Sequence, residues 1–238
     1  ALASYPELGC TGGPYVITSQ PGVRRDILCA GNPAVFDFVE KVLEEVIGLF
    51  PSKYIHIGGD ESPRTRWREC PECQSLIRRA GLKADARHSA EDKLQGYFNT
   101  RIEEFLARHG RRLIGWDEIV DGGMSPDATV MSWRGTAGGI RAADEGFDVI
   151  MSPNSSLYFD YYQSANIDTE PPTIGGYIPL KKVYDTEPVP DELTPEQARH
   201  IIGVQANVWT TYMRTDTILE HMLLPRLAAL AERAWSDR

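Results

Sequence analysis

The stretch Tyr54-Ile-His-Ile-Gly-Gly-Asp-Glu61 decides the fold, because a short apolar strand ends in it and two adjacent acids follow. Side chains alternate along a strand, so neighbouring acids on a regular strand would face opposite ways. Glycines at 58 and 59 let the backbone leave strand geometry, and Asp60 and Glu61 are therefore expected to turn into one pocket. The alternative is a helix N-terminus carrying acids that favour the helix dipole. His56 is interpreted as an internal hydrogen-bonding residue, not as the catalytic base.

Similar apolar strands recur along the chain, mostly with helical segments between them. Strands are expected at 53–59, 112–116, 128–133, 147–152 and 202–208, and helices at 33–50, 89–109, 138–145 and 217–235. Five short strands joined in this way predict a parallel sheet with helices packed outside it, the α/β class. The segment 153–196 has no clear period and is rich in Pro, Gly, Tyr and Asp, so it is expected to be a functional loop.

Local signals fix several helix boundaries. Asn32-Pro33 predicts a helix start, and Ser89-Ala-Glu-Asp92 has the spacing of a capping box. Pro225 is expected to kink the last helix, because proline removes a backbone donor. The first helix is predicted to bury one apolar stripe, formed by Val35, Phe38, Val39, Val42, Val46 and Phe50.

The residues suited to chemistry fall just after the ends of the expected strands. They are Asp60, Glu61, Trp116, Asp117, Glu118, Trp133, Tyr158, Asp160 and Trp209. In a β/α barrel this edge forms the active site. Aromatic faces and carboxylates suit a sugar, so a carbohydrate pocket is predicted. The alternative is structural, since tryptophans can close a barrel core and carboxylates can cap helices.

Composition excludes several classes of partner. A net charge of -9 with a pI near 5.1 would repel a phosphate backbone, so no nucleic-acid partner is expected. No apolar run is long enough for a membrane span, and the segment carries no secretion signal. The 238 residues are expected to form one domain or part of one. The start at Ala1, without methionine or leader, suggests a missing upstream portion.

The cysteines leave two chemistries open. Cys70-Pro-Glu-Cys73 is a C-x-x-C pair, whereas Cys10 and Cys29 stand alone in loop-like segments. A zinc site needs about four ligands, so the pair would have to recruit both distant cysteines or a histidine. Loop disulfides or inert thiols are the favoured interpretation, and no metal or other cofactor is expected.

These motifs resemble glycoside hydrolase family 20, the β-N-acetylhexosaminidases, and the resemblance extends over essentially the whole chain. The most specific motif is Tyr54 to Glu61, and the others are Tyr5-Pro-Glu-Leu8, Gly115-Trp-Asp-Glu118, Ser132-Trp-Arg-Gly135, Tyr158-Phe-Asp160 and Gln205-Ala-Asn-Val-Trp209. The resemblance implies a single partial catalytic domain over 1–238, with strands four to eight of a (β/α)8 TIM barrel. Three strands and a substrate-binding arginine would be absent, so this segment alone is expected to be inactive.

The resemblance also implies an exo-acting, retaining hydrolase that removes terminal β-linked N-acetylglucosamine or N-acetylgalactosamine through an oxazolinium intermediate. Glu61 would protonate the leaving oxygen and Asp60 would bind the acetamido N–H. Tyr158 would hold the acetamido oxygen. The acetamide and the sugar would be surrounded by the side chains of Trp116, Trp133 and Trp209. Asp160 would bind the sugar hydroxyls. The substrate would be a glycan or glycoconjugate in a secreted, periplasmic or lysosome-like compartment.

One position departs from the family pattern. The family usually places a glutamate two residues after the tryptophan of the eighth strand, where this chain has Thr211. Its loss is expected to relax discrimination between gluco and galacto sugars. A non-catalytic carbohydrate-binding protein is therefore a second hypothesis. A metal-dependent hydrolase using His56, Asp60 and Glu61 is a third, although no second histidine lies at ligand spacing.

Overall fold

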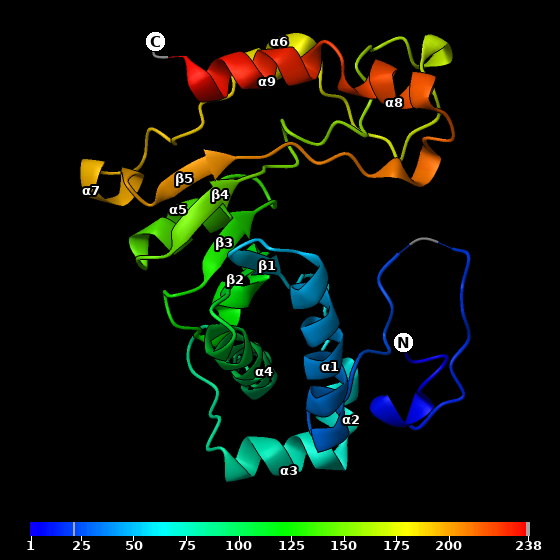
Figure 1. Ribbon diagram of the computed structural model, residues 1–238, viewed down its shortest axis with the longest axis vertical. Coiled ribbons are helices and arrows are strands. Elements are labelled where there is room, and N and C mark those ends of the chain that lie inside the picture. The colour runs from blue at the N-terminus through cyan, green and yellow to red at the C-terminus, as the bar shows by residue number, and fades with distance from the viewer. Residues whose placement is uncertain (21, 237–238) are drawn as a thin grey trace. The chain divides into compact units, whose positions relative to one another are not determined.

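The computed structural model describes residues 1–20 and 22–236, in two compact units with the bounds Ala1–Ala128 and Thr129–Arg238 (Figure 1). They are called here the first and the second unit. The expectation of one domain over the whole chain stays a prediction.

The first unit is built around two parallel strands. Strand β1 (Tyr54–His56) pairs with β2 (Arg112–Trp116), and His56 lies opposite Ile114. Pairing continues past β1, because the N–H of Trp116 donates to the carbonyl of Gly58 at 2.8 Å. The remaining elements are η1 (Pro6–Leu8), α1 (Pro33–Leu49), α2 (Thr65–Glu69), α3 (Pro71–Arg79), α4 (Ala90–Arg108) and η2 (Asp117–Gly122). Helices α2 and α3 were not predicted from the sequence.

The predicted starts of two helices are confirmed. The Asn32 side chain accepts from the N–H of Ala34 at 3.0 Å, with proline in the next position. Ser89 and Asp92 form the complete capping box of α4, each accepting from the other's backbone N–H. These bonds satisfy N–H groups that the first turn of a helix leaves without partners.

The predicted apolar stripe of α1 is wrong in part. Val35 is buried, but Val42 and Phe50 are 46% and 58% exposed. Helix α1 instead buries Phe36 and Leu43 together with Val35, and the Phe36 ring lies 5.0 Å from that of Phe98 on α4. The face of α1 that packs on α4 thus differs from the predicted face by a rotation about the axis of α1. The sequence periodicity could not distinguish the two, since both faces are apolar.

In the second unit, three strands lie in the order β3 (Thr129–Ser132), β4 (Asp148–Met151), β5 (Ile201–Val204), all parallel. Helix α5 (Ala137–Asp144) connects the first two. The other elements are η3 (Ile167–Thr169), α6 (Leu180–Tyr184), α7 (Pro195–Ala198), η4 (Thr210–Tyr212), α8 (Asp216–Leu223) and α9 (Arg226–Trp235). Strand β5 is shorter than predicted.

The last predicted helix is interrupted between α8 and α9, at Leu224 and Pro225. The helix therefore breaks completely where a kink was expected. Proline has no backbone N–H and cannot donate the hydrogen bond that would continue the helix. On the inner side of α9, Ala229 and Leu230 are buried in one cluster with Leu157, Phe159, Ile178 and Val183. This cluster holds the loop after β4 in place.

The α/β class is confirmed, because the strands of each unit pair in parallel and helices connect them. Parallel strands end at one edge, which is where such folds place binding residues. No helix in the described part of the chain is both long and apolar enough to span a membrane.

Candidate active site

The turn that carries the acid pair leaves strand geometry as predicted. Gly58 and Gly59 have φ angles of 77° and 91°, a region that favours glycine, and Glu61 has a φ of 45°. Among the described residues, Glu61 is the sole non-glycine residue with a positive φ. Strained backbone of this kind is often found at functional sites, where surrounding contacts hold it.

Two neighbours fix this turn. A Cβ at Gly59 would lie 2.7 Å from Cγ2 of Ile119, a fully buried residue of η2. On the other side, Nε2 of Gln95 on α4 donates to the carbonyl oxygen of Gly59 at 2.7 Å. Arg64 in turn donates to the Gln95 side chain and pairs with Asp92 at 2.7 Å. The turn is thus held by packing and by a chain of polar contacts.

His56 acts within this turn. Its Nδ1 accepts from the N–H of Gly58 at 3.0 Å, and its ring lies 4.9 Å from that of Trp116. Partial desolvation by neighbouring atoms lowers the pKa of His56, and the Asp60 carboxylate offsets part of that effect. Because Nδ1 is the acceptor, the neutral ring carries its proton on Nε2. The predicted hydrogen-bonding role of His56 is confirmed, but the residue is exposed, so the prediction of an internal position is wrong.

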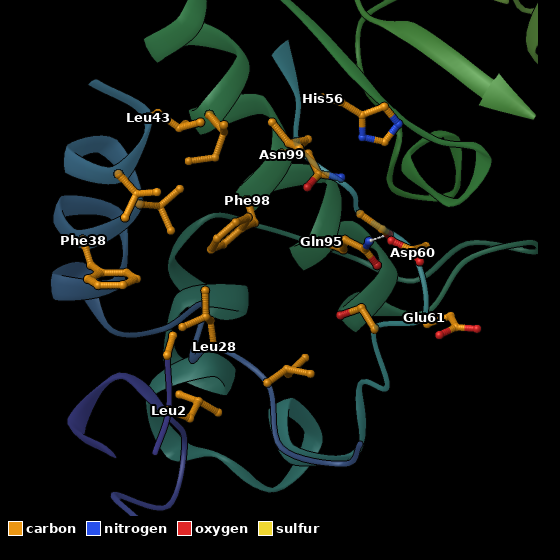
Figure 2. A pocket seen from close by; sticks show the side chains of 18 of the residues that line it. Leu2, Leu28, Phe38, Leu43, His56, Asp60, Glu61, Gln95, Phe98 and Asn99 are labelled. Atoms are coloured by element: carbon orange, nitrogen blue, oxygen red, sulfur yellow. Dashed lines mark hydrogen bonds between the residues drawn. The ribbon is translucent and has the colours of Figure 1, made fainter. Parts of the chain in front are cut away.

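Asp60 and Glu61 line one cavity of about 760 Å³ in the first unit (Figure 2). His56, Gln95 and Asn99 give it a polar side near the acids, and Figure 2 shows these side chains grouped apart from the apolar ones. The apolar side consists largely of Leu28, Phe38, Val39, Val42, Leu43 and Phe98. The predicted stripe of α1 therefore lines this cavity in part.

Asn99 was not anticipated from the sequence. It is 3% exposed, and its Nδ2 has no hydrogen-bond partner among the described residues. Trp116, at the end of β2, is 9% exposed, and Asp117 and Glu118 are buried in η2 behind it. These two acids therefore belong to the interior that supports the end of β2.

The second unit brings two predicted tryptophans next to Tyr158. Its ring stacks at 25° on that of Trp133, with the centroids 6.3 Å apart, and lies 6.3 Å from that of Trp209. Burial raises the pKa of Tyr158 to about 12, although hydrogen bonds from the side chains of Asn207 and Trp209 oppose the rise. The hydroxyl therefore stays protonated at neutral pH and can donate a hydrogen bond.

Asp160 lies two residues further on and is 6% exposed. Burial raises the pKa of its carboxyl, while its own backbone N–H, the Arg226 charge and the N–H of Trp209 lower it. Its Oδ1 has no hydrogen-bond partner in the described part of the chain. A buried acceptor without a partner costs stability, and a ligand hydroxyl would satisfy it.

Arg226 holds the backbone on both sides of Asp160 and was missed by sequence reasoning. It is fully buried at the start of α9 and donates to the carbonyls of Phe159 at 2.5 Å and Tyr161 at 3.0 Å. Desolvation lowers the pKa of Arg226 to about 10. The sequence gave no signal for this role, because Arg226 lies in none of the recognised motifs.

Asn207 is a second unanticipated residue. It forms a parallel bridge with Tyr158, and its side chain donates to Oγ of Ser152 at 2.9 Å. The N–H of Phe159 donates to the Asn207 carbonyl at 2.7 Å. Asn207 stands inside the quoted Gln205 to Trp209 motif, which was a signal that could have found it.

The structure thus forms two groups of the predicted residues. Asp60, Glu61 and Trp116 lie in the first unit. Trp133, Tyr158, Asp160 and Trp209 lie in the second. Carboxylates and aromatic rings at the ends of parallel strands define the class, an α/β protein with the side chains of a carbohydrate site.

Comparisons with known proteins identify the family. The profile of the glycosyl hydrolase family 20 catalytic domain matches residues 1–238, and the chain belongs to this family. A β-hexosaminidase of Porphyromonas gingivalis is 47% identical over 237 residues, which cover 99% of this chain and 30% of that protein. The chain therefore spans less than a third of that relative.

Solved structures agree with the family and the fold. The chitobiase of Flavobacterium johnsoniae superposes with a TM-score of 0.82 at 29% identity, covering 99% of this chain and 34% of its own. The exo β-N-acetylglucosaminidase of Vibrio harveyi, solved with N-acetylglucosamine, gives a TM-score of 0.80 at 29% identity, covering 100% of this chain and 37% of its own. Similarity of this extent agrees with the predicted strands and helices of a partial β/α barrel.

Proposed function

We propose that the protein containing this chain is an exo-acting β-N-acetylhexosaminidase that removes terminal β-linked N-acetylhexosamine. The observation that carries the proposal is the turn at Gly58 and Gly59, whose positive φ angles bring two adjacent carboxylates to one cavity. The family match and the names of the relatives support it. The proposal also includes a single partial catalytic domain over 1–238.

In the proposed mechanism the sugar supplies the nucleophile, an exception to the scheme in which an enzyme carboxylate attacks. The acetamido oxygen attacks C1 while Glu61 donates its proton to the glycosidic oxygen, and the C1–O bond breaks. The product is an oxazolinium ion and the free alcohol. Glu61, now ionised, takes a proton from a water molecule that attacks C1, which restores the acetamide and retains the anomeric configuration.

Asp60 accepts from the acetamido N–H in this proposal and balances the positive charge that develops on the oxazolinium ring. The Gly59 turn supports this role, because Gln95 and Ile119 hold the backbone from which Asp60 projects. Positioning of this kind places a reacting atom at attacking distance and lowers the entropic barrier.

The remaining predicted residues bind the sugar in this proposal. Tyr158 keeps its proton at neutral pH and donates to the acetamido oxygen. Trp116, Trp133 and Trp209 contact the acetamide and the sugar face. Asp160 accepts from a hydroxyl remote from C1, which its buried, unpartnered Oδ1 favours.

The test compares an aryl N-acetyl-β-glucosaminide with the matching aryl β-glucoside on the full-length protein. Turnover of the first and almost none of the second are expected, because the glucoside lacks the nucleophile. Glu61→Gln should slow an alkyl glycoside more than an aryl glycoside, whose good leaving group needs little protonation. Equal turnover of both sugars would contradict the mechanism, and binding without turnover would favour a carbohydrate-binding protein.

A further inference from the structure

The first unit contains a cluster of cysteines that the proposed reaction does not use. Cys10, Cys29, Cys70 and Cys73 come from three separate segments, and their sulfur atoms all lie within 4.8 Å of one another. All four are free thiols. Three of them are at most 4% exposed, inside a core that also contains Leu8, Val35, Trp67, Ile77 and Leu94.

The spacing of the sulfurs suits a tetrahedral metal site. Cys29 lies 3.6 Å from both Cys70 and Cys73, and Cys10 lies 3.9 Å from Cys73. With Zn–S bonds of about 2.3 Å, sulfurs at the corners of a tetrahedron lie about 3.8 Å apart. Disulfides would instead pair each sulfur with one partner. Cys29 is equally close to the sulfurs of Cys70 and Cys73, so the distances do not favour one disulfide partner over the other.

The local backbone explains how distant cysteines meet. Gly9 and Leu28 form an antiparallel bridge, which places the segments that carry Cys10 and Cys29 side by side. The N–H of Cys29 donates to the carbonyl of Leu8 at 2.8 Å, in support of this pairing. Cys70 is the N-cap of α3, and Cys73 lies in its first turn.

The backbone approaches the cysteine cluster closely at Gly31. The N–H of Gly31 donates to Sγ of Cys73 at 3.3 Å, and a Cβ at Gly31 would lie 2.3 Å from the backbone N of Cys73. A residue without a side chain is therefore required for this approach. The start of a helix favours a thiolate.

We propose that these four cysteines bind one structural Zn²⁺ ion. The site has four thiolate ligands and no open position, the pattern of structural zinc. Each thiol releases its proton to solvent on binding, and no redox step is involved. The ion would join the segment before α1 to α3, and Cys70 lies nine positions after Glu61 in the sequence. Zinc binding at Cys70 would therefore fix the C-terminal end of the segment that begins with the acid pair.

The first measurement needs no variant. The full-length protein, purified without chelator, is analysed for metal, and its cysteines are alkylated in denaturant with and without a strong chelator. We expect one zinc per chain, and the four cysteines to be alkylated fully only when chelator is added. Metal-free protein whose cysteines react only after reduction would overturn the proposal in favour of disulfides. Metal-free protein whose cysteines react at once would overturn it in favour of inert thiols.

Variants then assign the ligands. Cys10→Ser and Cys73→Ser should each lose the zinc and lower Tm by roughly 5 to 10 °C. Glu72→Gln is the matched control, because its carboxylate lies 3.7 Å from Sγ of Cys29 but is not a proposed ligand. It should keep the metal. Substitution with Co²⁺ should give the d–d bands of a tetrahedral thiolate site, and an octahedral spectrum would contradict the assignment. Iron in place of zinc would overturn the choice of ion.

Discussion

Gln95 on α4 donates a 2.7 Å hydrogen bond to the carbonyl oxygen of Gly59, one residue before Asp60. Gln95 is 4% exposed, so its side-chain amide cannot turn to solvent instead. Helix α4 thereby fixes the turn that carries the acid pair. Gln95 is a positioning residue, since it acts through the backbone of the turn.

Gln95→Met should lower the free energy of unfolding by about 1 kcal/mol, because it removes the hydrogen bond to the Gly59 carbonyl. It should also lower kcat roughly tenfold with little change in KM, since the acids lose their orientation. Gln74→Met is the control, because Gln74 donates to the carbonyl of Trp67 at 3.0 Å. Urea unfolding and steady-state kinetics should show similar destabilisation of both variants but reduced kcat in the first alone.

Gly59→Ala should destabilise the protein for two reasons, a φ of 91° and a Cβ only 2.7 Å from Ile119. Gly110→Ala separates them, because Gly110 has a φ of 69° with no atom near its Cβ position. The backbone cost alone is about 1 kcal/mol, and the contact should add about 1 to 3 kcal/mol at Gly59. Equal Tm values for the two variants would show that Ile119 does not confine the turn.

Stability should depend on the protonation of His56. Its folded pKa is lowered from 6.5, so the folded state favours the neutral ring whose Nδ1 accepts from Gly58. The stabilisation is fully present above pH 6.5 and is lost as the pH falls through the lowered folded value. Unfolding curves at about pH 7.5 and about pH 5 should differ less for His56→Gln than for the original protein. An unchanged difference would exclude His56 as the source.

Asp160→Asn should affect the stability of the protein and its binding of the sugar in opposite directions. Burial raises the pKa of this carboxyl from 3.8, so its ionised form costs stability at neutral pH. The variant should therefore have an equal or higher Tm, while KM for the sugar rises roughly tenfold or more through loss of a charged hydrogen bond. Asp168→Asn, on the short helix η3, is the control and should change neither quantity. A lower Tm with unchanged KM would indicate a structural role.

The sequence predicted features that depend on neighbours along the chain. The glycine turn at 58 and 59, the cap at Asn32 and the capping box at Ser89 are local, and each is confirmed. Contacts between distant segments could not be predicted in this way. Gln95 meets Gly59 across 36 positions and Arg226 meets Phe159 across 67, and neither residue lies in a recognisable motif.

The face of α1 and the cysteine cluster illustrate the same limit. Two faces of α1 are apolar, and only packing on α4 decides that Phe36 is buried while Val42 is exposed. The C-x-x-C pair alone gave a weak signal for metal. A bridge between Gly9 and Leu28 brings Cys10 and Cys29 to the pair, and the sequence contains no sign of that bridge.

The central claim is that the acetamido oxygen of the substrate is the nucleophile, while Asp60 orients it and Glu61 transfers protons. The most direct measurement is kcat/KM for aryl β-glucosaminides whose N-acyl group is acetyl, fluoroacetyl or trifluoroacetyl. Fluorine withdraws electrons from the attacking oxygen, so kcat/KM should fall stepwise, by more than about tenfold across the series. Equal values for all three substrates would contradict the account and would indicate a nucleophile supplied by the protein.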